Sequence, residues 1–407
     1  MRHPGRVIAA GLLGAILVGG TTVSLLRINA TPPAPSLQLD VARTYTPIPG
    51  PPVSVHQPPR GALALQGDGR DIALLDADTA RPIASVAKVM TALQTLRAHP
   101  LKDQLDEGPL LTMTDVDVAD YQATVRNDGS SLPVVAGEKL TERQLLLGLL
   151  LPSANNFADT LGRWVAGSVD AFVAQLNTAA QQMGMVHTHF VDPHGFSPDT
   201  VASASDLVLL GRAVLDSAPL SALVATQHAK LPDGTQLDNL DSLLGSVPGW
   251  LGIKTGSTPQ AGGCLLFAAR RDVGGGPVTM VGAVLDQTDL AAALDAAHTA
   301  VESGFQGYGV VTQDQPPPLT GQVTTRWGTT TSVHVATGGQ VAVPLRMGSV
   351  VQLSAVTRPV ASGAAVRTTV ATVVGTVDGV ARFHWTVVLD SGVPPPDWAW
   401  MLLHNNG

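Results

Sequence analysis

Hydrophobic positions change their spacing several times along the chain, and each change predicts a different element. Two short apolar runs, 62–65 and 72–75, flank Gly67-Asp68-Gly69, which predicts a β-hairpin with a tight turn. Apolar residues then recur at helical spacing from Ser85 to Ala98, and His99-Pro100 ends this predicted helix. Folded structure is therefore expected to open with a hairpin followed by a helix.

The middle of the chain is predicted to be mainly helical. Thr141, with Gln144 three positions later, forms a capping-box pattern in front of an apolar run that Pro152 interrupts. Helical spacing of apolar residues predicts two further helices, over 156–166 and 168–184. Each of these two segments ends at or beside a glycine, the residue type that most often ends a helix.

After Trp250 short apolar runs replace the helical spacing. The runs 264–269 and 278–285 predict neighbouring central strands, and 290–305 predicts a final helix. From Val323 to Val388 the residues alternate without helical spacing, which predicts a small all-β unit. The order of elements indicates an α/β (α+β) fold, in which helices and a sheet share one unit and an all-β unit follows.

Residues 1–60 carry an apolar stretch and then a run of prolines. Arg2 and Arg6 precede the uncharged residues Val7–Leu26, which are numerous enough to cross a bilayer as a helix. A signal-peptidase site requires two small residues, and Ile28-Asn29-Ala30 supplies one, which favours an uncleaved single-pass anchor over a signal segment of a secreted protein. The prolines that follow disfavour helix and sheet and predict an extended linker.

The positive-inside rule places the body of the protein outside the cytoplasm, on the far side of the cell membrane. Three consecutive prolines, Pro316-Pro317-Pro318, mark the joint before the all-β unit. The expected parts are a cytoplasmic N-terminus at 1–6, a transmembrane anchor or signal segment at 7–26, a Pro-rich linker at 27–60, the main folded domain at 61–308 and a C-terminal β domain at 319–407.

Composition excludes one class of function. Lysine and arginine total 24 against 32 for aspartate and glutamate, a net charge of −8, and no basic run is present. The chain therefore lacks the positive surface that a nucleic-acid-binding protein requires. The single cysteine, Cys264, stands in an apolar run and is expected to be a small buried side chain rather than a nucleophile. No cofactor is expected.

Ser85 and Lys88 stand one turn apart at the start of the helix predicted over 85–98. This i, i+3 spacing places the hydroxyl and the amine on one face. A buried lysine can lose its proton and act as the base that a serine nucleophile needs, and a helix start leaves the serine N–H free to stabilise an oxyanion. Taken alone, the pair is explained at least as well by a capping serine and a solvated lysine.

Two further patterns fit the same chemistry. Ser153 and Asn155 lie in a turn between two predicted helices, where they could relay a proton and hydrogen-bond a substrate amide; the plainer interpretation is a helix cap. Lys254 and Thr255 suit a carboxylate, and Gly256 leaves room for a substrate backbone at a strand edge; the plainer interpretation is a surface lysine at a strand end.

Together the three patterns carry more weight than each does alone. The chain has five lysines, and two of them, Lys88 and Lys254, complete these patterns. Neither Ser-x-x-Lys, Ser-x-Asn nor Lys-Thr-Gly occurs elsewhere in the sequence. In this order the three are the signature of penicillin-binding proteins and class A β-lactamases.

At these motifs and around them the chain resembles low-molecular-mass penicillin-binding proteins of the D-alanyl-D-alanine carboxypeptidase family, which are serine peptidases. The resemblance covers roughly Gly61 to Phe305. It implies a penicillin-binding-protein/β-lactamase-like transpeptidase fold, with a central antiparallel sheet and a helical subdomain, and makes 61–308 the serine DD-peptidase catalytic domain. Further segments that look like the family are Gly129-Ser130-Ser131-Leu132, 137–141, 150–155, 189–195 and 261–264.

The resemblance also implies roles and partners. Ser85 is the nucleophile acylated by the penultimate D-Ala, Lys88 is its base, and the N–H groups of Ser85 and Ser257 form the oxyanion hole. The implied partners are peptidoglycan stem peptides, β-lactam antibiotics as covalent inhibitors, and the lipid bilayer through the N-terminal segment. The implied catalytic residues are Ser85, Lys88 and Ser153, and the implied substrate-binding residues are Asn155, Lys254, Thr255, Gly256 and Ser257.

Two departures from related patterns bear on the expected activity. A class A β-lactamase carries a glutamate between its second and third motifs, and this chain has no glutamate between Glu142 and Glu302. Some relatives place an arginine beyond the Lys-Thr-Gly strand to bind the substrate carboxylate, whereas no arginine lies here between Arg271 and Arg326. Carboxylate binding is therefore expected to rest on Lys254 and Thr255. The missing glutamate predicts slow release of a bound penicillin.

Three alternatives stay open on the sequence alone. The first is a class A-like β-lactamase, and the second is a catalytically inactive penicillin-binding scaffold. The third is a metal-dependent peptidase, because one short segment gathers side chains that can ligate zinc. That segment also resembles the carboxypeptidase family, so no metal is expected; its candidate ligands are His187, His189, Asp192 and His194.

Overall fold

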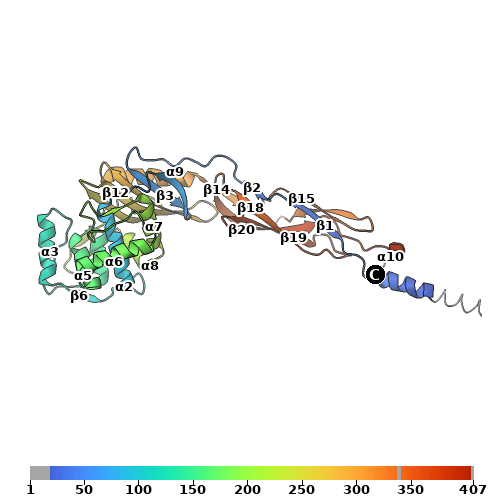
Figure 1. The fold of residues 1–407 in the computed structure, drawn as a ribbon, viewed down its shortest axis with the longest axis horizontal. Helices are drawn as coiled ribbons and strands as arrows, with labels where there is room; N and C mark the ends of the chain where they lie inside the picture. Colours follow the sequence, from blue (N-terminus) through green and yellow to red (C-terminus); the bar gives the residue numbers. More distant parts are fainter. Residues whose placement is uncertain (1–18, 337–340, 405–407) are drawn as a thin grey trace, which may run out of the picture. The chain divides into compact units, whose positions relative to one another are not determined.

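The computed structural model describes residues 19–336 and 341–404, and its helices and strands are labelled in Figure 1. The chain divides into two compact units. Residues Pro52–Tyr308 form the catalytic unit. The described residues before Pro52 join those from Gly309 onward in a second unit, called here the β unit.

A five-stranded antiparallel sheet forms the centre of the catalytic unit, in the order β11-β12-β13-β3-β4. The predicted hairpin is confirmed as β3 and β4, and the left-handed conformations of Asp68 (φ 50°) and Gly69 (φ 78°) fit the tight turn of a two-residue hairpin. The predicted strands at 264–269 and 278–285 are neighbours, as expected. The strands are β3 (Ala62–Gly67), β4 (Arg70–Leu75), β11 (Trp250–Thr258), β12 (Gly262–Asp272) and β13 (Pro277–Gln287).

Both faces of this sheet are buried, which explains why its strands are apolar at successive positions rather than at alternate ones. On β3, Leu63 and Leu65 pack on one face with helix α9 (Leu290–Gln306). Ala62 and Ala64 point to the opposite face, which belongs to the core shared with the remaining helices. The sheet is therefore held between α9 on one side and the helical subdomain on the other.

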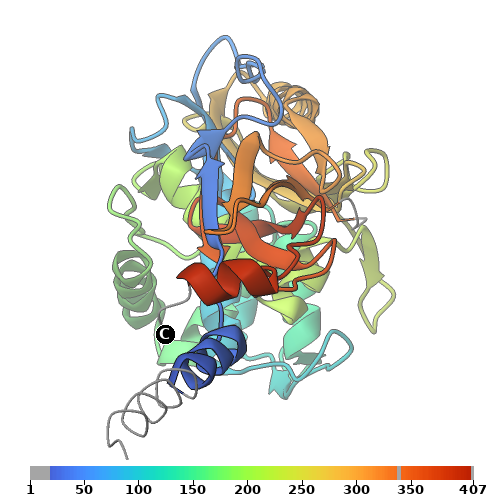
Figure 2. The same cartoon turned by 90° about the vertical axis from the view of Figure 1, so that its right-hand side faces the viewer.

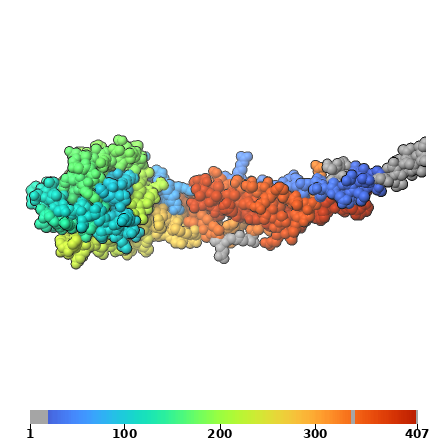
Figure 3. Space-filling view, turned by 90° about the horizontal axis from the view of Figure 1, so that it is seen from below, coloured from blue at the N-terminus to red at the C-terminus, as the bar shows by residue number. Residues whose placement is uncertain are grey.

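The helical subdomain, coloured cyan to green in Figure 3, supplies most residues of that second core. Its helix α4 begins at the predicted capping box, in which Thr141 and Gln144 each bond the other's backbone N–H. The helix predicted from Ser85 begins with a 3₁₀ turn. The helices of the subdomain are η1 (Ala84–Ala87), α2 (Lys88–Ala98), α3 (Asp115–Arg126), α4 (Glu142–Leu150), α5 (Asn155–Ala166), α6 (Val169–Gln182), α7 (Ala204–Leu215) and α8 (Ala218–Val224). The remaining short strands of the catalytic unit are β5 (Arg81–Pro82), β6 (Leu110–Thr112), β7 (Lys139–Thr141), β8 (Val201–Ala202), β9 (His228–Lys230) and β10 (Gln236–Asp238).

The β unit contains a seven-stranded sheet in the order β1-β15-β16-β20-β19-β18-β2. Its core includes Phe383 and Trp385, whose rings stack with their centroids 5.1 Å apart. Strands β14 and β17 pair separately. The elements are β1 (Ser36–Val41), β2 (Thr44–Tyr45), β14 (Tyr308–Thr312), β15 (Leu319–Thr324), β16 (Thr330–Val335), β17 (Ala342–Arg346), β18 (Val351–Thr357), β19 (Thr369–Val377), β20 (Val380–Leu389) and a short helix, α10 (Trp398–His404).

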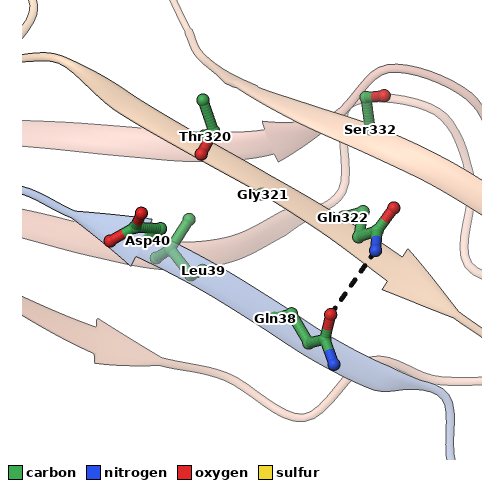
Figure 4. A pocket seen from close by; sticks show the side chains of 7 residues that line it. All are labelled: Gln38, Leu39, Asp40, Thr320, Gly321, Gln322 and Ser332. Carbon is green, nitrogen blue, oxygen red and sulfur yellow. Dashed lines mark hydrogen bonds between the residues drawn. The ribbon is translucent and has the colours of Figure 1, made fainter.

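The prediction that residues 27–60 form a linker without sheet structure is wrong. Strand β1 pairs with β15 along its whole length, from Ser36↔Thr324 to Val41↔Leu319. The prolines stand on either side of β1, so they do not interrupt its backbone pairing, and its apolar residues alternate as in a half-buried strand. Figure 4 shows the outer side of this pair, where the Gln322 amide donates to Gln38 Oε1 (3.4 Å). The N-terminal segment therefore belongs to the β unit.

The predicted membrane anchor, 7–26, lies mostly outside the described residues. Residues 19–29 are helical, and Arg27 Nη1 donates to the carbonyl oxygen of Leu402 in α10 (3.3 Å). Figure 2 shows this helix in dark blue and α10 in red. The sequence pattern did not predict α10; Asp397 accepts from Trp400 N (2.7 Å) at its start, directly after three prolines. Within 19–336 and 341–404, no single helix is long and apolar enough to span a membrane, although α7 and α8 meet the criterion as a pair bent by 110°.

Candidate active site

Ser85 and Lys88 are joined by the 3₁₀ turn η1. In a 3₁₀ helix the side chains at i and i+3 eclipse one another, so this turn brings the two closer than an α-helical turn does. Lys88 Nζ and Ser85 Oγ lie 2.8 Å apart, within hydrogen-bond distance. The preceding residue, Ala84, has a φ of 47°, a strained conformation for a residue with a side chain. Contacts with the surrounding structure must therefore stabilise the strained backbone of Ala84 at the start of this turn.

Lys88 is fully buried, with 0% of its surface exposed. Its Nζ also donates to the carbonyl oxygen of His194 (2.9 Å), which fixes the amine beside Ser85. Burial disfavours the charged form, and the positive charge of Lys254 adds to that effect, so the pKa of Lys88 lies well below its usual value. A neutral amine held against the hydroxyl can accept its proton.

The loop at 189–201 packs against the segment that carries Ser85 and Lys88. Asp192 Oδ1 accepts from Gly195 N (2.6 Å), and Thr91 Oγ1 donates to Pro193 O (2.5 Å). Gly195 has a φ of 75°, and a Cβ at this position would lie 1.8 Å from the carbonyl oxygen of Ala84. A glycine is therefore required where the loop meets the strained residue in front of the nucleophile.

Ser153 and Asn155 lie between α4 and α5, as the sequence predicted. Ser153 is 2% exposed and has a φ of 70°, a rare conformation for a residue with a side chain, and its Oγ has no hydrogen-bond partner among the described residues. The predicted proton relay to Lys88 is therefore not made by a direct hydrogen bond in this structure. Asn155 begins α5, and its N–H donates to Ser130 O (2.8 Å), which ties the turn to the family-like segment at 129–132.

Lys254, Thr255 and Gly256 lie on β11, the strand at one edge of the catalytic sheet. A Cβ on Gly256 would lie 3.0 Å from Ser85 N, so β11 passes directly beside the nucleophile's N–H, and only a glycine leaves this approach open. The next residue, Ser257, is exposed. The structure thus places the Lys-Thr-Gly strand beside the Ser85 N–H, which is one of the two predicted oxyanion donors.

Lys254 and Thr255 are each only 2% exposed. Burial lowers the pKa of Lys254 to about 7, and the negative charge of Asp241 works in the opposite direction. Asp241 itself accepts from Trp250 Nε1 (2.8 Å). An ammonium in such a setting gains from pairing with an anion, so the site suits the carboxylate that the sequence predicted for it.

Two titratable residues lie near the site: Asp159 was not predicted, and His194 was named only as a candidate zinc ligand. Asp159 lies one turn after Asn155 on α5, and burial together with Asp120 raises its pKa to about 7. His194 Nε2 lies 3.8 Å from Asp159 Oδ1, and burial lowers the pKa of His194 to about 4. The i, i+4 spacing of Asn155 and Asp159 was the signal available in the sequence.

The histidine-rich segment is not arranged as a metal site. Within the described ranges, no group of three or more His, Cys, Asp or Glu side chains could hold a metal ion. His187 lies 4.0 Å from Asp206, while His194 lies 3.5 Å from Asp192, so the two histidines face different carboxylates. Cys264 is buried, and burial raises the pKa of its thiol to about 12, which leaves it protonated.

A serine next to a buried lysine can be acylated without a histidine base, and here both lie beside the edge of an antiparallel sheet that can accept an extended peptide. The molecule is therefore a serine peptidase of the penicillin-binding kind. The sequence model described as D-alanyl-D-alanine carboxypeptidase matches residues 66–287, more than half of the chain, and the chain belongs to this family.

Individual relatives agree with this assignment. The chain is 32% identical to a D-alanyl-D-alanine carboxypeptidase of Streptomyces sp. strain K15 over 262 residues, which are 60% of this chain and 86% of that protein. It is 37% identical to D-alanyl-D-alanine carboxypeptidase DacB2 of Mycobacterium tuberculosis over 209 residues, 50% of this chain and 67% of that protein. The crystal structure of the Streptomyces K15 DD-transpeptidase is similar with a TM-score of 0.54 and 30% identity, over 62% of this chain and 100% of that one. The predicted fold is thus confirmed.

Proposed function

We propose that this chain is a serine-type D-alanyl-D-alanine carboxypeptidase that removes the terminal D-Ala from peptidoglycan stem peptides, and that penicillins acylate the same serine. The observation that carries the proposal is the contact of 2.8 Å between Ser85 Oγ and the fully buried Lys88 Nζ. Burial keeps the lysine available as a base at neutral pH, and a solvated lysine would not have this property.

We infer that acylation takes two steps. Lys88 takes the proton of Ser85 Oγ while the oxygen attacks the carbonyl carbon of the penultimate D-Ala, and the N–H groups of Ser85 and Ser257 donate to the resulting oxyanion. When the C–N bond breaks, the leaving D-Ala nitrogen takes a proton, delivered from Lys88 through Ser153. An ester between Ser85 and the shortened peptide remains.

Water then hydrolyses the ester, releasing the shortened peptide and returning a proton to Ser85. A penicillin reacts in the same way, but its leaving nitrogen stays tethered to the acyl group and obstructs the water. The absence of glutamate from 143 to 301 leaves no counterpart of the residue that activates water in class A β-lactamases. We therefore expect a long-lived penicillin adduct, and its rapid loss would favour the β-lactamase alternative.

The substrate carboxylate provides the test of this proposal. D-Ala release is compared between a peptide ending in D-Ala-D-Ala and the same peptide amidated at its C-terminus. The wild type should prefer the free acid, and Lys254→Ala should lose most of this preference, because a charge-assisted hydrogen bond contributes about 1.5–3 kcal/mol, or roughly ten- to a hundredfold. Ser85→Ala is the control and should release no D-Ala from either peptide. Equal turnover of acid and amide by the wild type would contradict a carboxypeptidase.

We also propose that residues 7–26 hold the enzyme in the cell membrane with its catalytic unit on the cell-wall side. The support is in the sequence, where two arginines precede twenty uncharged, mainly apolar residues. In a bacterial host the full chain should sediment with membranes and stay there after carbonate extraction. A soluble product whose N-terminus begins after Ala30 would show that the segment had been removed as a signal peptide.

A further inference from the structure

The chain reaches Ser85 through a short segment that begins at β5 and passes through the strained residue Ala84, whose φ is 47°. Backbone bonds hold part of this segment, because Ile83 N donates to Thr200 O (3.3 Å) and β5 pairs with β8. A strained conformation persists only where several contacts determine it. The contacts that the side chains of β5 make therefore bear on the position of Ser85.

Arg81, four residues before Ser85, makes the charged contacts of this segment. Its Nη1 donates to Asp286 Oδ2 (2.7 Å) near the end of β13, and its Nη2 donates to Asp76 in the turn that follows β4. A guanidinium can make both contacts at once, because its donors form a fixed planar fork. The Arg81 side chain is only 24% exposed, which limits screening of these pairs by water and salt. Arg81 thus joins the segment before the nucleophile to two other parts of the catalytic unit.

Both carboxylates that bind Arg81 are themselves fixed. Asp286 has a φ of 56° and Asp76 a φ of 44°, in the left-handed region that non-glycine residues rarely adopt. Each accepts a second hydrogen bond, Asp286 Oδ1 from Arg60 Nη2 (2.7 Å) and Asp76 Oδ1 from Thr79 Oγ1. The hydrogen bonds from Thr79 and Arg81 lower the pKa of Asp76, so its carboxylate is charged at physiological pH. The two carboxylates can therefore hold the guanidinium of Arg81 in one position.

We propose that Arg81 is a positioning residue for acylation, which bridges Asp286 and Asp76 and thereby fixes the strained approach to Ser85. The inference rests on the proposed role of Ser85 as the nucleophile, and it adds a residue that contacts neither the substrate nor the reacting atoms. Proton transfer requires Ser85 Oγ to stay within hydrogen-bond distance of Lys88 Nζ, and a displacement of about 1 Å can slow a reaction by about a hundredfold. Loss of the bridge is expected to change the direction from which the chain enters the 3₁₀ turn.

The test follows penicillin acylation of Ser85 by intact-protein mass spectrometry. It measures the rate constant of adduct formation at saturating penicillin and the final fraction of protein that carries the adduct. Arg81→Met removes both ion pairs, and its rate constant should fall by about ten- to a hundredfold while nearly all of the protein is acylated in the end. The penicillin concentration that gives half of the maximal rate should not change, because Arg81 does not contact the ligand. Arg81→Lys keeps the charge but cannot bridge two carboxylates as a planar fork does, so its rate constant should be intermediate.

The matched control is Arg60→Met, which removes the other ion pair of Asp286. Residue 60 does not lead into the nucleophile, so this variant should be acylated at the wild-type rate. Asp286→Asn removes the charge that Arg81 binds and should slow acylation without a change at residue 81. Together with Arg81→Lys it decides the outcome by the same rate constant if Arg81→Met does not fold.

A purely stabilising ion pair would give a different result. Arg81→Met would then lose thermal stability to the same extent as Arg60→Met, and a smaller fraction of it would react, at the wild-type rate constant. That result would overturn the proposal, as would equal rate constants in the wild type, Arg81→Lys and Asp286→Asn. Failure of the proposed function is distinguishable from both, because Ser85 of the wild type would then form no penicillin adduct.

Discussion

The catalytic unit and the β unit differ most in what they bury. The catalytic unit encloses ionisable groups such as Lys88, Lys254 and Glu142, the last with both carboxylate oxygens unpaired. In the described part of the β unit, the one buried polar side chain is Thr331, and its hydroxyl pairs with Ser391 Oγ (2.7 Å). Buried charges oppose folding by several kcal/mol each unless well paired. The buried ionisable groups are thus concentrated in the catalytic unit, and their burial lowers the stability of that unit.

Backbone strain follows the same division. In the catalytic unit, non-glycine residues with positive φ include Ala84 and Ser153, both inside the site. In the described β unit, they are Arg367 and Asp378, and Asp378 stands in the hairpin turn between β19 and β20. A strained backbone beside the nucleophile positions the reactive side chains, and an unstrained backbone would place them differently. The strained residue in the hairpin turn only helps to reverse the direction of the chain.

The largest effect is expected from replacing Lys88 with methionine. General-base help contributes about 10²- to 10⁴-fold, so Lys88→Met should slow penicillin adduct formation by that factor, measured by intact-protein mass spectrometry. Its thermal unfolding temperature should rise or stay equal, because an apolar side chain of similar size replaces a buried amine. Lys102→Met, on the surface, is the control and should change neither quantity. Normal acylation by Lys88→Met would mean that another base operates.

A smaller effect is expected from the titration of Lys254. Its pKa is about 7 in the folded protein and about 10.4 in an unfolded chain, so between these values the unfolded state binds the extra proton. The free energy of unfolding should therefore rise with pH from about 7 to 10, by up to about 1.4 kcal/mol per pH unit from this group.

Urea titrations at several pH values measure this slope. Lys254→Met should flatten it in part, and the depressed pKa of Lys88 acts in the same direction and should leave a remainder. Below pH 7 the lysine is protonated in both states, so its contribution should no longer change. An unchanged slope in the variant would show that Lys254 keeps its proton in the folded protein.

The smallest effect tests the β unit. Leu39 is half-buried in β1 and packs against the β-unit core, so Leu39→Ala should lower the free energy of unfolding of that unit by about 1–2 kcal/mol. Gln38→Ala, at the exposed neighbouring position, should cost less than about 0.5 kcal/mol. D-Ala release should be the same in both variants. Identical stability of the two variants would show that β1 contributes no packing.

The sequence predicted correctly those features that depend on interactions between residues close together in the chain. The capping box at Thr141, the hairpin turn at Asp68 and the pairing of Ser85 with Lys88 each depend on residues a few positions apart, and the structure contains all three. The proline-flanked strand at Ser36–Val41 was missed because its partner lies 278 to 288 residues later, from 319 to 324, and no local signal specifies such a pairing.

The sequence also did not predict that the carboxyl groups of Glu142 and Asp159 are buried. Glu142 stands in the first turn of a helix, where glutamates are usually solvated, yet it is 0% exposed and its pKa is raised to about 7 by burial and Asp106. Asp159 becomes significant only when the loop with His194 packs against α5. Such environments arise from tertiary contacts between segments that are far apart along the chain.

The pairing of β1 with β15 also sets the order in which the protein can fold as it is synthesised. The ribosome makes β1 first, then the entire catalytic unit, and only afterwards the strand that completes β1's hydrogen bonds. At a synthesis rate of roughly 5–20 residues per second, β1 stays without its partner strand for on the order of tens of seconds. Pro35 at its start and Asp40 within it are the kind of residues that discourage a free strand from pairing with the wrong chain during such an interval.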